Sequence, residues 1–71
     1  MLRLTNTLNL YVVKTNKDIE KYPLECGSLI RTVLGNDHKG TVRVQVMAGK
    51  YEGISGGLLK QDCTGNNLEV I

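Results

Sequence analysis

The sequence predicts an all-β protein, a small five-stranded barrel made from one strongly bent antiparallel sheet. Apolar and polar residues alternate in two segments, 2–12 and 41–47, which is the period of a half-buried strand. Clusters of Gly, Asn and Asp separate the short apolar runs, as turns do. Five short strands in 71 residues favour closure of the sheet, because closure removes exposed strand edges. We expect a single domain over residues 1–71.

The first predicted strand covers residues 2–12. Its apolar residues share even positions and are Leu2, Leu4, Leu8, Leu10 and Val12. Because Asn6 interrupts this set, the regular part is expected to begin near Leu8. The polar segment 14–23, "KTNKDIEKYP", is predicted to be a mixed-charge loop, with Asn16 able to cap one helical turn. Pro23 favours extended geometry at Tyr22 and restarts the chain as a strand.

Two further strands follow, at 27–34 and 41–48. Segment 27–34, "GSLIRTVL", is apolar on both faces, so we expect it in the interior of the sheet. Residues 35–40, "GNDHKG", predict a turn. In segment 41–48 the period of two predicts that Val42, Val44 and Val46 face the core, while Arg43 and Gln45 face solvent.

The last part of the chain predicts a hairpin, a bend and a final strand. Gly49 and Lys50 are expected to form a two-residue type II′ turn that sets Ala48 opposite Tyr51 and places Tyr51 over the valine face. Gly53 is expected to mark a bulge. Segment 55–60, "SGGLLK", predicts a bend or a short tight helix, and 68–71, "LEVI", a strand with Leu68 and Val70 on one face.

Composition limits the classes of function. Aromatic residues make up 4% of the chain, so the core is predicted to be aliphatic. The net charge of +2 is too small to predict nucleic-acid binding by itself. No apolar run approaches the roughly 18 residues that a membrane span needs, so we expect a cytoplasmic protein without a membrane partner. A homodimer or higher oligomer would stabilise so small a core, and the sequence leaves this open.

No pattern of catalytic or metal-binding residues is evident. Cys26 and Cys63 lie 37 positions apart, without the close cysteine or histidine spacing of a zinc site. They are expected to be reduced, structural thiols, with a disulfide as the alternative. His38 stands without a second ligand or nucleophile near it in sequence, which favours a solvated turn histidine. The segment "GISGGLLK" lacks the spacing of a phosphate-binding loop. We expect a non-enzymatic protein with no cofactor and no metal.

The order of these segments resembles the Src-homology-3-like barrels. Such barrels have two middle strands, a distal hairpin, a tight-helix turn and a last strand in this order. The corresponding segments here are "GSLIRTVL", "GTVRVQV", "KYEGISGG" and "NNLEVI". The resemblance covers residues 24–71 and implies a fold without a particular function. The chain lacks the Tyr- and Trp-rich groove with which the peptide-binding members hold proline-rich ligands.

A second resemblance is to the carbon-storage-regulator family of RNA-binding proteins. The segments "MLRLT", "TVLG", "GTVRVQV" and "AGK" are similar to that family's opening and middle strands. Membership implies a strand-swapped homodimer that binds GGA-containing RNA loops. This chain carries no basic residue in "LTNTL", has about ten additional residues near 14–23, and ends on a turn and a strand instead of the family's C-terminal helix.

The remaining candidate for function is the outer face of the sheet. Arg31 and Arg43 are expected to share it with other long or basic side chains. The candidate binding residues are Arg3, Arg31, Arg43, Gln45 and Met47, with Lys50 and Tyr51 in the adjoining hairpin. The leading prediction is a module that binds another protein, as an accessory subunit or a small inhibitor such as mobile elements encode. The alternative is a barrel that binds RNA or DNA through this Arg/Lys face.

Overall fold

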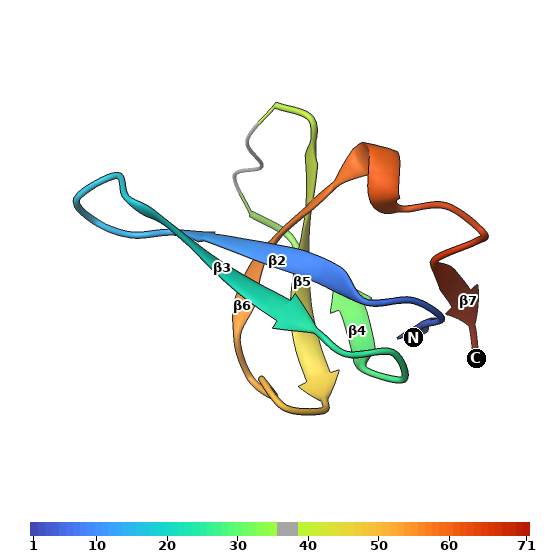
Figure 1. Ribbon diagram of the computed structural model, residues 1–71. Coiled ribbons are helices and arrows are strands. Elements are labelled where there is room, and N and C mark those ends of the chain that lie inside the picture. Colours follow the sequence, from blue (N-terminus) through green and yellow to red (C-terminus); the bar gives the residue numbers. More distant parts are fainter. Residues whose placement is uncertain (36–38) are drawn as a thin grey trace.

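The computed structural model describes residues 1–35 and 39–71 and shows an all-β chain folded as one seven-stranded antiparallel sheet (Figure 1). The strand order is β3-β2-β6-β5-β4-β1-β7. The elements are β1 (Leu2–Leu4), β2 (Leu8–Val13), β3 (Ile19–Leu24), β4 (Leu29–Thr32), β5 (Thr41–Ala48), β6 (Ser55–Leu59), the 3-10 helix η1 (Lys60–Asp62) and β7 (Leu68–Val70).

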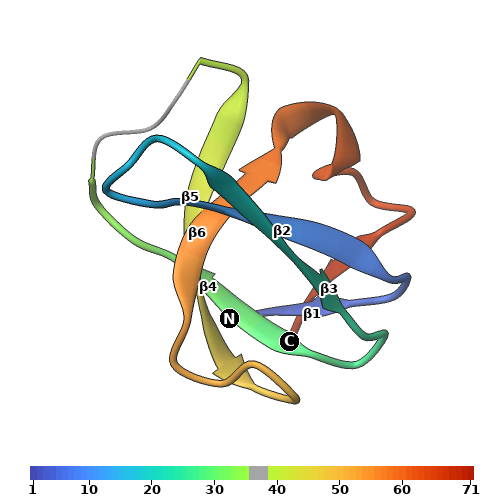
Figure 2. The ribbon, with the colours of Figure 1, turned by 60° about the vertical axis from the view of Figure 1, so that its left-hand side comes forward.

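The sheet is strongly bent but not closed, because β3 and β7 are free edges. The β2–β3 hairpin crosses β5 and β6, and its loop projects from one side of the body (Figure 1). Figure 2 shows the two ends of the chain next to each other, where the Ile71 N–H donates to the Met1 carbonyl at 3.2 Å. The prediction of a bent antiparallel sheet is confirmed, whereas its closure into a five-stranded barrel is not.

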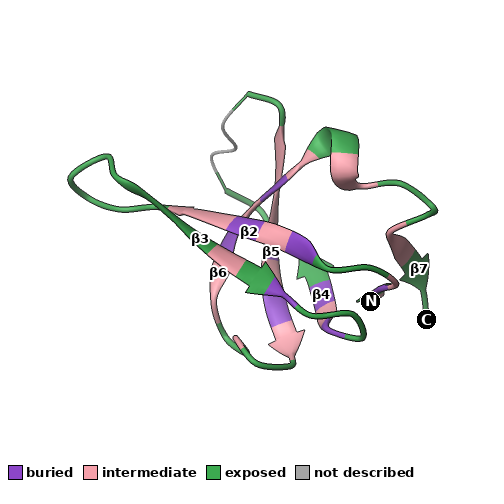
Figure 3. Cartoon of the chain, viewed as in Figure 1, coloured by how far each residue is buried: buried purple, intermediate pink, exposed green. Residues whose placement is uncertain are grey.

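The core is aliphatic, as composition predicted. Its buried members, all Leu, Ile or Val, are Leu4, Leu8, Leu10, Leu24, Ile30, Val44, Val46 and Leu58. Figure 3 shows that buried and half-exposed residues alternate along β2. In β5, Val44 and Val46 are each 1% exposed and Val42 packs against the cluster. The period of two along this strand is therefore confirmed, as is the interior position of β4 between β5 and β1.

The predicted loop at 14–23 is wrong in its second half, because residues 19–23 belong to the strand β3. Lys14 N–H donates to the Asp18 carbonyl at 2.7 Å and closes a tight β2–β3 hairpin, in which Lys17 has a φ of 69°. Tyr22 is extended before Pro23, as expected. The first strand is divided in two by residues 5–7, so that β1 pairs with β4 and β7 while β2 pairs with β3 and β6.

The two-residue turn at Gly49 and Lys50 is also wrong. The turn extends from Gly49 to Gly53, and Tyr51 lies within it. Gly53 N–H donates to the Val46 carbonyl at 2.8 Å, and Val46 N–H donates to the Ile54 carbonyl at 2.9 Å. Gly53 and Ile54 are thus both opposite Val46, and Gly53 has a φ of 92°. This arrangement confirms the predicted bulge.

Segment 55–59 is a strand and not the predicted bend. Gly56 is buried where β6 lies between β2 and β5. A Cβ there would lie 2.6 Å from the Tyr11 carbonyl oxygen, so only glycine lets the two strands approach this closely. The tight helix comes later, at Lys60–Asp62, and the last strand is confirmed as β7, with Leu68 and Val70 paired to Leu4 and Leu2.

Candidate binding surface on the outward sheet face

A row of side chains crosses four strands on the face of the sheet that points away from the core. Tyr11 in β2 lies directly opposite Lys21 in β3 and Gly57 in β6. Gly57 in turn lies opposite Arg43 in β5. Directly opposite residues in an antiparallel sheet have Cα atoms about 4.5–5.5 Å apart, so the four positions of this row are neighbours on one face.

A second, shorter row adjoins the first. Gln45 in β5 lies opposite Arg31 in β4 and Ser55 in β6. The Arg31 guanidinium donates two hydrogen bonds to Oε1 of Gln45, from Nη2 at 3.0 Å and from Nε at 3.3 Å. Because Gln45 is neutral, these bonds hold the guanidinium in place without compensating its charge. We call the two rows together, Lys21, Tyr11, Gly57, Arg43, Arg31, Gln45 and Ser55, the outward face.

Arg43 is half-buried because its stem packs on Gly35. A Cβ at Gly35 would lie 2.5 Å from Cδ and 2.8 Å from Nε of Arg43. The absence of a side chain at position 35 therefore lets the arginine lie against the backbone that follows β4. A long basic stem that covers the backbone in this way keeps its charged end at the surface.

The outward face is electrostatically one-sided. It carries the cations Lys21, Arg31 and Arg43, whereas no Asp or Glu occupies an outward position in β2, β3, β4, β5 or β6, all of which the structure describes. The carboxylates in the described part of the chain lie elsewhere, at Asp18, Glu20, Glu25, Glu52, Asp62 and Glu69. The described strand residues of this face would therefore attract an anionic ligand.

The structure assembles only part of the predicted set of binding residues. Arg31, Arg43 and Gln45 share the outward face, as predicted. Met47 is half-buried at the bulge in β5, where the register to β4 shifts. Arg3 lies in β1 and forms a hydrogen bond and an ion pair with Glu69 of β7, so its charge is compensated.

Lys50 and Tyr51 lie on the opposite side of the sheet from the outward face. The Tyr51 ring packs against the core and meets the Tyr22 ring edge-on, with centroids 5.1 Å apart. The Lys50 ammonium lies 5.5 Å from the Tyr51 ring centroid, at cation–π distance. Tyr51 therefore covers the core, as predicted from the valine face, and this pair is separate from the Arg31–Gln45 contact.

Sequence reasoning missed Tyr11 and Lys21 as members of the surface. Tyr11 occupies an odd position in the alternating segment 2–12, which indicates the solvent side, but the alternation does not identify its neighbours on other strands. Lys21 falls in the segment predicted to be a loop, because β3 is mostly exposed and carries little apolar pattern. The alternation of Tyr22 and Leu24 with Lys21 and Pro23 is the one signal that could have revealed the strand.

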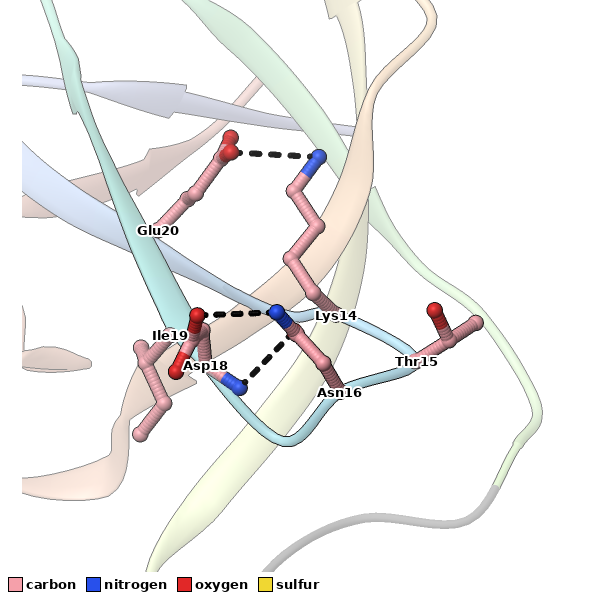
Figure 4. Close-up of a pocket in the computed structure, with 6 residues that line it drawn as sticks. All are labelled: Lys14, Thr15, Asn16, Asp18, Ile19 and Glu20. Carbon is pink, nitrogen blue, oxygen red and sulfur yellow. Dashed lines mark hydrogen bonds and ion pairs between the residues drawn. The ribbon is translucent and has the colours of Figure 1, made fainter.

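The tip of the β2–β3 hairpin forms a second surface feature (Figure 4). Asn16 fixes the turn, since its Oδ1 accepts from the Asp18 N–H at 3.2 Å and its Nδ2 donates to Oδ2 of Asp18 at 2.9 Å. A shallow hollow lies among residues 14–20, bordered by an ion pair of 3.2 Å between Lys14 and Glu20. Beside it Ile19 is 64% exposed. The tip is thus an ordered turn flanked by apolar surface.

One exposed hydrogen bond links the titration of two groups on β3. The Tyr22 hydroxyl donates to Glu20. This bond, with help from the nearby Lys14, holds the pKa of Glu20 below its ordinary value. The same bond raises the pKa of Tyr22, because deprotonation would remove the donor and place two negative charges together.

The two cysteines are free thiols in different surroundings. Cys26 is exposed, and its Sγ lies 3.7 Å from the Leu4 carbonyl oxygen. Burial, and then the charge of Asp62, raise the pKa of the half-buried Cys63 thiol. Within residues 1–35 and 39–71, no group of three His, Cys, Asp or Glu is placed to hold a metal ion. His38 lies outside the described residues.

Known proteins offer no guide to this surface. A scan against protein-family models, a search of curated proteins and a search of solved structures each returned no match. In the part of the chain that the structure describes, no helix has the length and apolar character required to cross a membrane. The function must therefore be argued from the arrangement of the side chains.

Proposed function

We propose that the chain is a non-enzymatic binding protein whose outward face binds single-stranded nucleic acid. One observation carries this proposal: Tyr11 stands between Lys21 and Arg43 on a face whose described strand residues include no Asp or Glu. An aromatic ring flanked by cations matches the general chemistry of single-strand recognition. Bases stack on aromatic rings, and lysine and arginine contact the phosphates.

The spacing within the row suits a base and its backbone. Gly57 separates Tyr11 from Arg43, and the Thr41 side chain lies beside it, because a Cβ at Gly57 would be 3.2 Å from Cβ of Thr41. A base stacked on Tyr11 would therefore extend toward the guanidinium past this one small side chain. Arg31 has five N–H donors and uses two of them on Gln45, which leaves donors for a phosphate oxygen. The ligand would lie across β3, β2, β6 and β5, with its phosphates toward both ends of the row.

Fluorescence anisotropy of a labelled single-stranded oligonucleotide tests this proposal. We expect the binding constant to fall with rising salt, and the slope of log K against log salt to weaken by about 1.4 in the double variant Arg31→Gln/Arg43→Gln. Tyr11→Leu should reduce affinity by about 5- to 150-fold, the equivalent of about 1–3 kcal/mol of stacking. No binding at low salt would overturn the proposal.

A matched control is available at Lys50, whose cation lies on Tyr51 away from the outward face. Lys50→Gln changes the net charge by one unit, as each of the arginine changes does. It should leave the salt slope unchanged. An equal loss in Lys50→Gln and in the arginine variants would mean that binding follows total charge and not this surface.

The hairpin tip supports a second candidate, a protein-interaction or inhibitor module. Its turn is fixed by Asn16, and Ile19 and Val13 are 64% and 43% exposed beside it. A protruding, preorganised turn with apolar flanks loses little entropy on docking to a protein. A pull-down with RNase treatment in parallel separates the candidates. A protein partner retained after RNase but lost with Ile19→Asp supports this one.

We also propose that the chain resembles the Src-homology-3-like barrels in shape, without sharing a particular function with them. The resemblance is supported by the bend between β1 and β2 and by η1, the tight turn that precedes the last strand β7. An open sheet of this shape presents its convex face to a ligand, where the row around Tyr11 lies.

A further inference from the structure

The two free edges of the sheet differ in how well they are protected. In the β2–β3 hairpin Lys14 N–H donates to the Asp18 carbonyl, so Lys14 and Asp18 form a hydrogen-bonded pair. Because such pairs alternate along an antiparallel ladder, the even-numbered residues of β3 bond to β2 and the odd-numbered ones do not. The backbones of Lys21 and Pro23 consequently point away from β2, toward the open edge. Pro23 has no N–H to offer there, and Lys21 adds a charge. Both features hinder the pairing of another strand.

The edge at β7 has no proline, and its one charged residue, Glu69, is compensated by Arg3. Ile71 N–H donates to the Met1 carbonyl at 3.2 Å, and Thr5 N–H donates to the Asn67 carbonyl at 2.8 Å. The odd-numbered residues of this segment therefore bond to β1, and the even-numbered ones face the edge. Leu68 N–H is satisfied by the Thr64 carbonyl at 2.9 Å. This leaves the N–H and the C=O of Val70 directed at solvent.

The same edge exposes apolar side chains. Val70 is 82% exposed, Ile71 55% and Met1 54%. Val70 lies opposite Leu2, on the core side of the sheet, and Leu2 also lines an adjacent open groove of about 290 Å³. The groove is mostly apolar, with Leu58 and Leu68 among its other lining residues. Exposed apolar side chains next to free backbone groups mark an interaction site.

Charge and symmetry identify the partner as a second copy of this chain. Arg3 and Glu69 compensate each other beside the edge, so two identical edges can approach without repulsion. We propose that β7 pairs antiparallel with β7 of a second copy about a two-fold axis at Val70. Each Val70 N–H then donates to the Val70 carbonyl of the other copy. The apolar row of Leu2 and Val70 continues across the axis.

The alternative symmetric register is disfavoured. An axis at Glu69 would set two glutamates directly opposite each other, which destabilises strand pairing. It would also leave the Val70 carbonyl of each copy without a donor, because the opposing Leu68 N–H is already bonded to Thr64. The register at Val70 avoids both costs.

Sedimentation equilibrium over a range of concentrations tests the proposal. The wild-type chain should reach twice its 7.8 kDa mass, and Val70→Lys should remain at the mass of one chain. Ile19→Lys is the matched control, since it places the same charge at an exposed apolar site on the protected edge, and it should still dimerise. Circular dichroism checks that each variant is folded. A wild-type chain that is monomeric throughout, or a Val70→Lys chain that still dimerises, overturns the proposal.

A cross-linking experiment tests the register itself. In a Cys26→Ser/Cys63→Ser background, Val70→Cys should form a disulfide-linked dimer under mild oxidation. Hydrogen-bonded antiparallel pairs have Cα atoms about 5.5 Å apart, within the range that a disulfide spans. Ile19→Cys in the same background should form far less, and equal yields would contradict the register. The result is independent of nucleic-acid binding, because the outward face and the β7 edge share no residue.

Discussion

The substitution Gly56→Ala tests the close packing of β6 against β2. A Cβ at position 56 would lie 2.6 Å from the Tyr11 carbonyl oxygen, 3.0 Å from Cγ2 of Val12 and 3.1 Å from Cγ of Leu10. The nearest of these atoms belongs to the backbone of β2, which pairs over six residues with β3 and cannot move independently. The added methyl group must therefore push β6 away from β2.

The magnitude follows from two opposing effects. Overpacking of a well-packed interior costs about 1–3 kcal/mol. Replacing glycine by alanine also lowers the conformational entropy of the unfolded chain, which offsets about 0.4–1 kcal/mol of this cost. We expect Gly56→Ala to lower the free energy of unfolding by about 1–2 kcal/mol, which corresponds to a fall in Tm of roughly 5–15 °C for a domain of this size.

Urea unfolding followed by far-ultraviolet circular dichroism measures the effect, with Gly65→Ala as the control. A Cβ at Gly65 meets no atom within 4 Å, so the control should match or slightly exceed the stability of the wild-type chain. Equal unfolding midpoints for the two variants would refute the close approach of β6 to β2.

Four further predictions concern burial and titration. Leu58→Ala should lower the free energy of unfolding by about 2–5 kcal/mol in urea titrations, because Leu58 is fully buried. Ultraviolet titration should show one tyrosine that ionises above pH 10 and returns to the ordinary range in Glu20→Gln, since the bond to Glu20 raises the pKa of Tyr22. The stability from this bond should be lost as pH rises through the raised pKa of Tyr22, and as pH falls through the lowered pKa of Glu20. Iodoacetamide should modify Cys26 before Cys63, as followed by mass spectrometry, because Cys26 is exposed whereas burial raises the pKa of Cys63.

The central strand β5 was predictable from the sequence because its two faces meet different surroundings. Val44 and Val46 are buried while Arg43 and Gln45 point outward, which is the condition under which a period of two appears. The edge strand β3 lacks that contrast. Of its residues only Leu24 is fully buried, so the segment had the polar composition of a loop.

Tertiary contacts decided the segments where local sequence pointed elsewhere. Gly56 and Gly57 suggest a turn by composition, but packing between β2 and β5 makes them part of a strand. The proposed binding surface likewise depends on contacts between strands that are distant in sequence. The outward direction of Tyr11 and Arg43 followed from alternation along each strand, whereas their common row depends on the β2–β6 and β5–β6 registers, which no single segment encodes.

The most direct measurement of the proposed function is a titration of the ¹⁵N-labelled chain with a single-stranded oligonucleotide, followed by two-dimensional amide spectra. Binding to the outward face predicts progressive shifts at Tyr11, Gly57 and Arg43, with the amides of the β7 edge unchanged. Shifts confined to the hairpin tip at Asn16, or no shifts at low salt, would contradict it.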